Sequence, residues 1–430
     1  MKKLLQRFLG TCARAAILRE RPRVVAVAGS VGKSSTKEAI AVAGGAYDPT
    51  SRALVSPKNY NNELGIPLTA FRTPAPGRSP VAWIRLLVRA ALTALGAKRI
   101  NASSLVLEFG TDHPGDLAYL IGIAHPDVAV LTAIAPEHTE FFGSVEAVAD
   151  EELAIIRTLT EDGVAILNAD DAEVMKGKEM TDATVVTFGE SPTSDVRLLS
   201  SEVVVDEQDP EASGLEVHII ALGLGARLRL RGVFGKPHAL AAAAALAVVH
   251  ALDIDFHDSA EQLKAYRGMP GRTRLITGIK RTTLLDDSYN SSPLAALSAV
   301  RDLAKFPRRD GAKRIAALGD MLELGALADD AHRDLGRAVA ELGIDMLVAS
   351  GTLAHAIADG AKDAGMPEGS IFVFPSSVEA GRFIQERLHE GDVVLIKGSQ
   401  GARMEKITKE LMAEPLRAKE LLVRQTEEWQ

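Results

Sequence analysis

The sequence has a single cysteine, Cys12, among its 430 residues, so an internal disulfide is excluded. This composition fits a reducing compartment, and we expect the protein in the cytoplasm. The sequence also lacks an apolar run of the roughly 18–20 residues that a membrane-spanning helix needs. The N-terminal segment has no small-residue cleavage site after a continuous apolar core, which makes it a poor signal peptide. We therefore predict a cytoplasmic protein without a transmembrane segment.

Positive charge is also scarce: the sequence has 49 Lys and Arg residues and 57 Asp and Glu residues, which gives a net charge of −8. This balance argues against a nucleic acid held by bulk electrostatic attraction. Residues 1–22 differ from the rest of the chain, since they are basic and amphipathic. Such a segment can lie on a membrane surface or form a helix packed on the first domain, and we favour the packed helix.

Residues 24–36, VVAVAGSVGKSST, are the stretch around which the chain is organised. Their β-branched apolar start is typical of a buried strand, and residues 37–41 suit a helix. This order, a strand followed by a glycine-containing loop, Lys-Ser and a helix, is the layout of a phosphate-binding loop. The backbone N–H groups of such a loop face an anion. Lys33 is expected to reach the β- and γ-phosphates of a nucleotide, and Ser34 to offer its hydroxyl to Mg²⁺. The residues of this loop are Gly29, Ser30, Val31, Gly32, Lys33, Ser34 and Ser35.

Two more positions suit ligands beside this loop. Glu108 ends the apolar run 104–109, and an acidic residue there is expected to give Mg²⁺ a second contact. His138 follows the apolar run 127–132, where a ligand role and an ordinary role are both open. A third feature is a cluster of amides whose side chains either bind a ligand or tie down their own loop; taken alone, the pattern favours the second role. These amides are Asn59, Asn61 and Asn62.

The pattern of apolar runs predicts an α/β fold with two sheets. Residues 195–233 alternate and contain turn residues, which indicates antiparallel strands, and the Ala-rich residues 238–251 predict a helix packed closely on a sheet. From residue 274, apolar runs alternate with helical stretches, the pattern of a parallel sheet with right-handed crossovers. We predict an N-terminal helical extension (1–22), a central P-loop ATPase domain with a mixed sheet (23–273) and a C-terminal Rossmann-like parallel-sheet domain (274–430).

Polar loops follow three of the strands expected in the second sheet, at residues 286–293, 319–321 and 397–399. Ligands of such sheets bind beyond the carboxyl ends of the strands, so the three loops describe one cleft. No glycine-rich dinucleotide fingerprint opens this domain, and we do not infer NAD.

The order of these pieces resembles the Mur ligase family, and within it the branch that adds D-alanyl-D-alanine. The resemblance covers about residues 23–430. The motifs that carry it are GSVGKSSTKE (29–38), NYNNELGIPLT (59–69), LEFGTDHPGDLAYL (107–120), PEHTEFFGS (136–144), LNADD (167–171), DDSYNSSP (286–293), RIAALGDMLELG (314–325) with His332, and KGSQGARME (397–405).

The resemblance implies an ATP- and Mg²⁺-dependent ligase that phosphorylates a carboxylate and lets an amine attack the acyl phosphate, forming an amide. It implies that Ser34 and Glu108 hold one Mg²⁺ and His138 contacts a second. It assigns Asn290, Arg314 and Asp320 to the nucleotide, and Lys397 and Ser399 to the incoming amine. On the substrate side we add the amides Asn59, Asn61 and Asn62. The expected substrate is a small molecule or peptide of the peptidoglycan-precursor type; the alternatives are a folylpolyglutamate-type ligase and a non-ligating ATP-binding scaffold.

Three departures from the family pattern are visible. No domain that binds a uridine diphosphate precedes the phosphate loop, so the uridine group is held otherwise or by a partner protein, or the substrate lacks it. Glu152 stands where the family carries a carbamylated lysine, and it either supplies the same negative charge or is an ordinary surface glutamate. Ser292 and Gln400 replace an asparagine and an arginine of the family motifs, which bears on the substrate more than on ATP.

Overall fold

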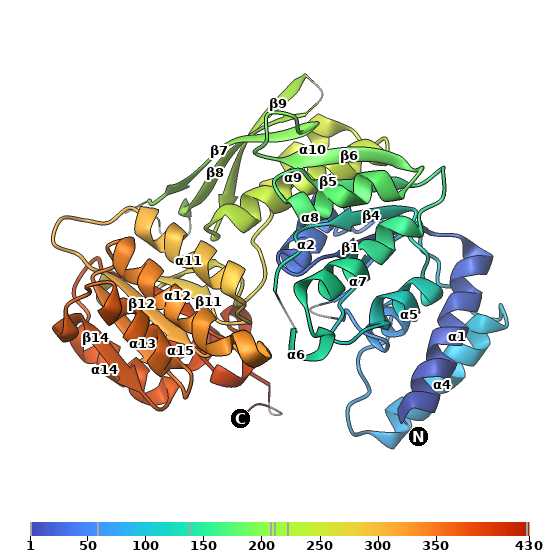
Figure 1. Cartoon of the computed structure of the whole chain (residues 1–430). Coiled ribbons are helices and arrows are strands. Elements are labelled where there is room, and N and C mark those ends of the chain that lie inside the picture. Colours follow the sequence, from blue (N-terminus) through green and yellow to red (C-terminus); the bar gives the residue numbers. More distant parts are fainter. Residues whose placement is uncertain are drawn as a thin grey trace.

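The computed structural model describes residues 2–57, 60–136, 139–206, 209, 212–221, 223–426 and 429. Two sheets form two lobes, with the first sheet and its helices in blue to yellow and the second in orange to red (Figure 1). The order of the first sheet, sheet A, is β2-β3-β1-β4-β5-β6-β7-β8-β9. Its strands are β1 (Arg23–Ala28), β2 (Ala53–Val55), β3 (Ser104–Glu108), β4 (Val128–Leu131), β5 (Val164–Asn168), β6 (Thr184–Gly189), β7 (Val196–Val204), β8 (Gly214–Ala221) and β9 (Leu224–Arg231).

Sheet A is parallel from β2 through β7 and antiparallel from β7 through β9. The antiparallel strands expected in residues 195–233 are therefore confirmed. Helices accompany the sheet in chain order. They are α1 (Lys2–Glu20), α2 (Lys33–Ala43), α3 (Gly65–Ala70), α4 (Pro80–Ala94), α5 (Asp116–Ile123), α6 (Thr139–Phe142), α7 (Val145–Arg157), α8 (Ala172–Met175), α9 (Lys236–Ala251) and α10 (Phe256–Leu263).

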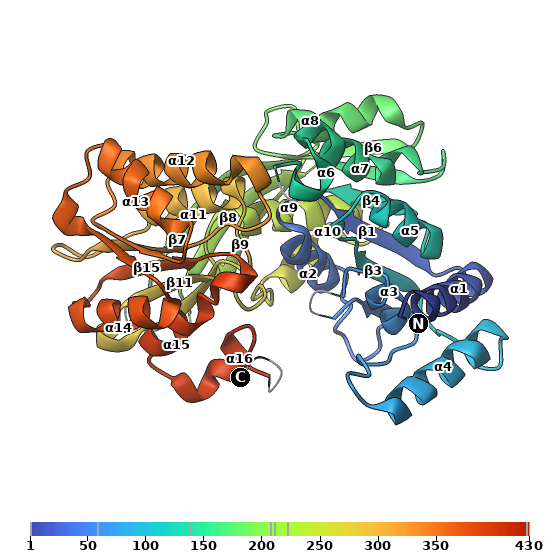
Figure 2. The ribbon, with the colours of Figure 1, turned by 60° about the horizontal axis from the view of Figure 1, so that its bottom comes forward.

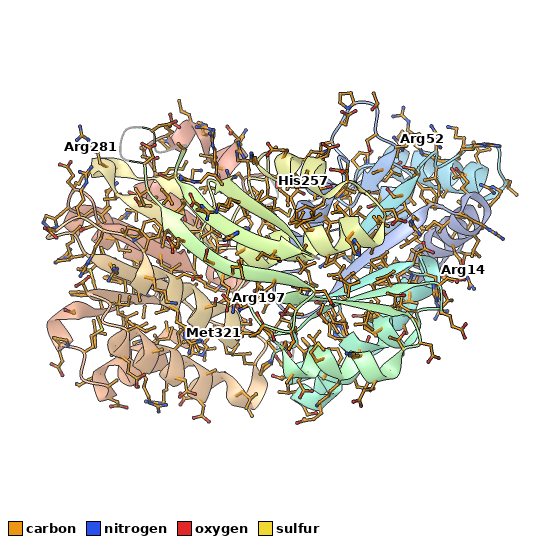
Figure 3. The ribbon with its side chains drawn as sticks, turned by 90° about the horizontal axis from the view of Figure 1, so that it is seen from above. Arg14, Arg52, Arg197, His257, Arg281 and Met321 are labelled. Carbon is orange, nitrogen blue, oxygen red and sulfur yellow. The ribbon has the colours of Figure 1, made fainter. Side chains whose placement is uncertain are left out.

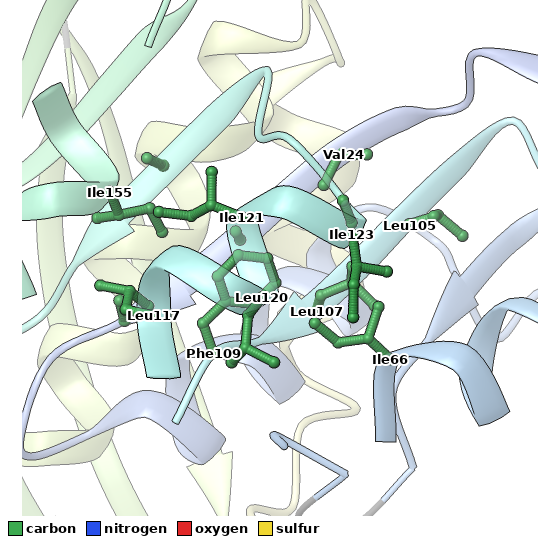
Figure 4. Close-up of a cluster of buried hydrophobic side chains, with 14 of the residues drawn as sticks. Val24, Ile66, Leu105, Leu107, Phe109, Leu117, Leu120, Ile121, Ile123 and Ile155 are labelled. Atoms are coloured by element: carbon green, nitrogen blue, oxygen red, sulfur yellow. The ribbon is translucent and has the colours of Figure 1, made fainter. Parts of the chain in front are cut away.

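Both faces of sheet A are covered, which explains why its parallel strands are apolar throughout. Successive side chains of β1 alternate between two cores: Val24 packs with one, and Val25 with the other. The core around Val24 includes α5 and α7, whose Leu120 and Ile155 belong to the same buried cluster as Leu107 of β3 (Figure 4). The opposite core contains α2, α9 and α10. The alanines of α9 are buried against α2 and the sheet, as the Ala-rich pattern predicts.

The second sheet, sheet B, has the order β10-β11-β15-β12-β13-β14. Its strands are β10 (Arg274–Thr277), β11 (Thr283–Asp287), β12 (Arg314–Gly319), β13 (Met346–Ser350), β14 (Ile371–Phe374) and β15 (Val393–Lys397). Its helices are α11 (Pro293–Lys305), α12 (Ala328–Glu341), α13 (Ala354–Asp363), α14 (Ser377–Arg387), α15 (Glu405–Leu411) and α16 (Ala418–Leu421). They cover both faces of the sheet, in the arrangement of a doubly wound α/β domain.

The parallel sheet expected in the second domain is confirmed for the five strands β11 to β15, and one edge carries a further strand, β10, that the sequence analysis did not predict. Strand β10 pairs antiparallel with β11, with Arg274 opposite Asp286. Only a short turn, Gly278–Thr282, joins the two strands, and a parallel pairing would need a much longer crossover. The other strands of sheet B are parallel, so their carboxyl ends share one edge.

Helix α1 packs on the first lobe, as we expected for the N-terminal segment. Its inward residues Leu9, Ala13 and Ala16 are completely buried, and α1 lies beside α4, as two views show (Figures 1 and 2). Among the helices that the structure describes, none combines the length and apolar character needed to cross a membrane.

Candidate active site

The phosphate-binding loop leaves the carboxyl end of β1, a central strand that pairs with β3 and β4. Gly29 has φ +117°, and a Cβ there would lie 2.5 Å from Thr132 Oγ1 and 2.8 Å from the carbonyl oxygen of Ala133. Only glycine fits this close approach. Ser30 fastens the loop to the same segment, because its backbone N–H donates to the Ala133 carbonyl at 2.7 Å. The backbone is thus held in a compact anion cradle ahead of α2.

Lys33 is the first residue of α2, directly after Gly32, which has φ +92°. Its Nζ donates to the carbonyl oxygens of Gly29 and Ser30, the latter at 3.2 Å. The ammonium group therefore lies over the loop itself, where the phosphates of a nucleotide would bind.

Glu108 and Ser34 form an oxygen-rich pair beside this loop. Strand pairing sets Glu108 opposite Val27, and its Oε1 accepts hydrogen bonds from Ser34 Oγ at 3.0 Å and Asn61 Nδ2 at 3.4 Å. The Glu108 side chain is 1% exposed, and its Oε2 is buried without a hydrogen-bond partner among the described residues. A buried carboxylate oxygen next to a hydroxyl is a donor set that fits Mg²⁺.

Glu152 reaches the loop from α7. The helix starts after Ser144, the N-cap, whose Oγ accepts from Ala147 N at 3.2 Å. Glu152 is 2% exposed, and its Oε2 accepts a hydrogen bond from Gly29 N at 2.7 Å. The alternative of an ordinary surface glutamate is therefore wrong. The acidic neighbour Glu151 points elsewhere and accepts from Leu117 N at 2.9 Å.

Lys37 lies one helical turn after Lys33, and the sequence analysis did not single it out. It is completely buried, and its Nζ donates to the Ser56 carbonyl at 2.6 Å. Burial lowers its pKa, and the nearby charge of Glu108 acts in the opposite direction. Lys37 thus ties the end of β2 to α2 beneath the loop.

Across the cleft, the loops of sheet B are held by a buried ion pair. Lys397 is 3% exposed, and its Nζ lies 2.6 Å from Asp287 Oδ2 and donates to the Asn290 carbonyl at 2.9 Å. Ser399 Oγ donates to the Ser291 carbonyl at 3.2 Å and accepts from Leu322 N at 2.9 Å. Ser399 therefore lines the wall of the cleft, and Lys397 supports that wall through the Asn290 carbonyl.

Arg272 joins the two lobes and is a site residue that the sequence analysis missed. Its Nη2 donates to Ser34 Oγ at 3.3 Å, and its guanidinium lies 4.0 Å from the centre of the Tyr289 ring. The available signal was its place in the Met-Pro-Gly-Arg turn just before the second sheet. Buried His238 holds the backbone here: its Nε2 donates to the Arg272 carbonyl at 2.9 Å, so its Nδ1 accepts from the Tyr266 hydroxyl at 2.7 Å. Burial lowers the pKa of His238 to about 4, which keeps the ring neutral.

A cleft of about 660 Å³ lies between the lobes. From sheet A it is lined by Ser30, Gly32, Lys33, Asn61, Asn62 and Glu108, and from sheet B by Arg272, Tyr289, Asn290 and Ser399 among others. Val31, Ser35 and Lys397 line a smaller cavity of about 60 Å³ behind the loop. The cleft also includes Asp112, His113 and Arg403, which the sequence analysis did not select.

Two of the predicted nucleotide residues are not among the residues that line the cleft. Arg314 begins β12 at the amino edge of sheet B, and its guanidinium donates to the Phe306 carbonyl. The carboxylate of Asp320 caps the start of α13, accepting from Leu353 N and Ala354 N. The structure does not bring these residues to the loop of Lys33. Asn62 lines the cleft but also ties down its own loop, because its Oδ1 accepts from Gly65 N at 3.1 Å. Asn59 and His138 lie outside the described residues.

The fold and the cleft define a class of protein: a P-loop nucleotide-binding protein in which a second α/β lobe covers the phosphate loop. Family comparison makes this specific. Residues 87–247 match the Mur ligase middle domain, and residues 271–400 match the Mur ligase glutamate ligase domain. Together these matches span about two thirds of the chain, and the protein belongs to the Mur ligase family.

Individual relatives agree with this assignment. The chain is 29% identical over 395 residues to the UDP-N-acetylmuramoyl-tripeptide--D-alanyl-D-alanine ligase of Bacillus subtilis, covering 92% of this chain and 77% of the relative. The structure of MurF ligase from Thermotoga maritima in complex with ADP is 26% identical, with a TM-score of 0.75 and coverage of 94% and 83%. The Mycobacterium tuberculosis folylpolyglutamate synthase complexed with ADP has a TM-score of 0.64, 18% identity and coverage of 94% and 93%, and shares the fold alone.

Proposed function

We propose that this protein is an ATP-dependent ligase that joins a carboxylate to an amine through an acyl phosphate, with release of ADP. The observation that carries the proposal is the buried pair of Ser34 and Glu108 beside the phosphate loop, facing Arg272 and the loops of the second lobe. Such a cleft can hold a triphosphate on one wall and an acceptor on the other. Enclosure between the lobes would also keep water from the activated acyl group.

We assign charge compensation to the residues of the first wall. A carboxylate and a γ-phosphate repel each other, and the transferring phosphoryl group needs cations around it. Lys33 would supply one positive charge, while Ser34 and Glu108 would hold Mg²⁺, which supplies further charge neutralisation when bound. We propose that His138 contacts a second Mg²⁺, by resemblance alone.

We assign Glu152 to the position of the family's carbamylated lysine. Its carboxylate supports the loop through the backbone N–H of Gly29, so it would orient one donor of the anion cradle. On the second lobe, Asn290 and Arg272 are our candidates for contact with the nucleotide, since both line the cleft. Lys397 and Ser399 would act on the amine side by shaping the loop walls.

The substrate that we propose is a peptidoglycan precursor with a D-alanyl-D-alanine-like or amino-acid acceptor. The named activity of the Bacillus subtilis relative supports this choice, and Asn61 and Asn62 border the cleft where the substrate would enter. We also propose that a separate partner protein binds the uridine group. For the domain limits we propose 1–22, 23–273 and 274–430, and the start of β10 at Arg274 supports the last of these limits. We place the reaction in the cytoplasm, where ATP is available.

Substrate-dependent release of ADP tests the proposal. The protein would be incubated with ATP, Mg²⁺, a UDP-N-acetylmuramoyl tripeptide and D-alanyl-D-alanine, and each component omitted in turn. We expect ADP and amide product in equal amounts, and only when donor and amine are both present. The folylpolyglutamate-type alternative is tested by replacing the pair with a folate and glutamate. ADP release independent of any acceptor would favour the ATP-binding scaffold and contradict the ligase proposal.

A further inference from the structure

We propose that helices α1 and α4 dock the protein onto the surface of an anionic lipid bilayer. The two helices pack side by side at one end of the molecule (Figures 1 and 2). This is the end marked by Arg14 in Figure 3, opposite to Arg281 on the second lobe. The inference concerns the outer surface and does not depend on the proposed ligase activity.

Helix α1 has two apolar faces where a helix on a protein surface needs only one. The inner face, with Leu9, Ala13 and Ala16, is completely buried in the first lobe. The outer face carries Leu4 and Leu18, which are 72% and 60% exposed. A further residue of this face, at the helical spacing i+4 from Leu4, is Phe8, which is 43% exposed.

Helix α4 repeats this arrangement. Leu86 and Ala90 are buried against the lobe, whereas Ile84 and Val88 on the outer side are 62% and 52% exposed. Leu95, directly after the helix, is 83% exposed. Of the 21 large apolar side chains that are exposed among the described residues, seven lie on or directly after these two helices: Leu4, Phe8, Leu18, Val81, Ile84, Val88 and Leu95. Exposed apolar side chains gathered on neighbouring helices mark an interaction surface.

The charge around these side chains indicates which kind of partner binds to this surface. Segments 1–22 and 72–103, which contain both helices, carry twelve Lys and Arg residues and one acidic residue, Glu20, although the whole chain has a net charge of −8. An anionic surface would therefore attract this end of the molecule and repel the rest. Apolar side chains flanked by cations are the composition of helices that lie in the interface of an anionic bilayer.

The docking surface also adjoins the cleft. Trp83 on the inner side of α4 lines an apolar groove of about 360 Å³ together with Tyr60, Leu64 and Leu68. The groove includes Asn62, which also lines the cleft between the lobes. A bilayer on the outer side of α4 would thus lie one helix away from the entrance to the site.

Vesicle sedimentation tests this proposal with the full chain. One set of vesicles contains phosphatidylcholine alone, and the other contains phosphatidylglycerol in addition. We expect binding to the anionic vesicles only, weakened by salt. Replacing Arg85 and Arg89 by Gln should weaken partitioning by about fivefold for each cation removed. Phe8→Ser with Ile84→Ser should also reduce it, while Leu416→Ser, at a site 98% exposed on the other lobe, should leave it unchanged.

The remaining outcomes contradict the proposal. No binding to anionic vesicles would refute it, and so would equal binding to both kinds of vesicle or binding that these variants leave unchanged. If Phe8→Ser with Ile84→Ser abolishes self-association while vesicles are not bound, the surface is a protein interface and the lipid assignment is wrong. Thermal melting of each variant verifies that the fold is intact, since all the substituted apolar side chains are exposed.

Discussion

The contact between Glu152 and the phosphate loop can be tested by the substitution Glu152→Gln. The carboxylate of Glu152 is buried and accepts from Gly29 N at 2.7 Å. A hydrogen bond to a charged group contributes about 1.5–3 kcal/mol, which corresponds to a factor of about 10–150 in an equilibrium or rate. Glutamine keeps the size and one acceptor oxygen but removes the charge. We therefore expect kcat/KM for ATP to fall about 10- to 100-fold.

The assay is the coupled measurement of ADP release in the presence of donor and amine, with thermal melting to follow the fold. Glu151→Gln is the matched control, because Glu151 lies on the same helix but accepts from Gly115 N and Leu117 N at the start of α5. This control should alter stability without the loss in kcat/KM. Added bicarbonate should not change the rate of the unsubstituted protein. A lysine needs carbon dioxide to become a carbamate, whereas the Glu152 side chain already is a carboxylate. A folded Glu152→Gln protein with the parent's kcat/KM would refute the role of Glu152.

Two further substitutions follow from the junction between the lobes. Arg272→Lys loses the planar contact with the Tyr289 ring and the hydrogen bond to Ser34 in its present geometry. We therefore expect the KM for ATP, measured by steady-state kinetics, to rise about tenfold. An unchanged KM would contradict this role of Arg272. Asp302→Asn concerns a carboxyl on α11 whose pKa is raised to about 7 by burial. The folded protein keeps this carboxyl protonated while the unfolded chain ionises it, so the stability of the fold decreases as pH rises from about 4 to about 7. The Asn variant should therefore melt higher than the parent at pH 8 and gain nothing at pH 4, and a pH-independent difference in melting temperature would be contrary to this reasoning.

Much of the first wall could be predicted from local sequence, because strand, loop and helix follow one another within residues 23–43. The apolar run before Gly29 and the helix after Gly32 are short-range features that the structure confirms. The position of Glu108 at the end of β3 is confirmed in the same way. Their catalytic roles stay predictions.

The second wall was harder to predict, since it depends on which edge of the sheet a residue reaches. Arg314 is in a family motif but opens its strand, so it lies at the amino edge of sheet B, away from the cleft. Asp320 follows the same strand, yet its carboxylate is engaged by backbone N–H groups of the neighbouring crossover. Arg272 enters the cleft only because the chain crosses between lobes there. These placements follow from long-range packing, on which sequence spacing carries no information.

The most direct test of the account follows the oxygen atoms of the carboxylate. A donor substrate labelled with ¹⁸O in the reacting carboxyl group is converted with ATP, and the released phosphate is analysed by mass spectrometry. If the cleft joins the phosphoryl group to the carboxylate before the amine attacks, one labelled oxygen appears in the phosphate for each amide formed. Amide formation with unlabelled phosphate would contradict the account, since the carboxylate oxygen would then never have been bonded to phosphorus.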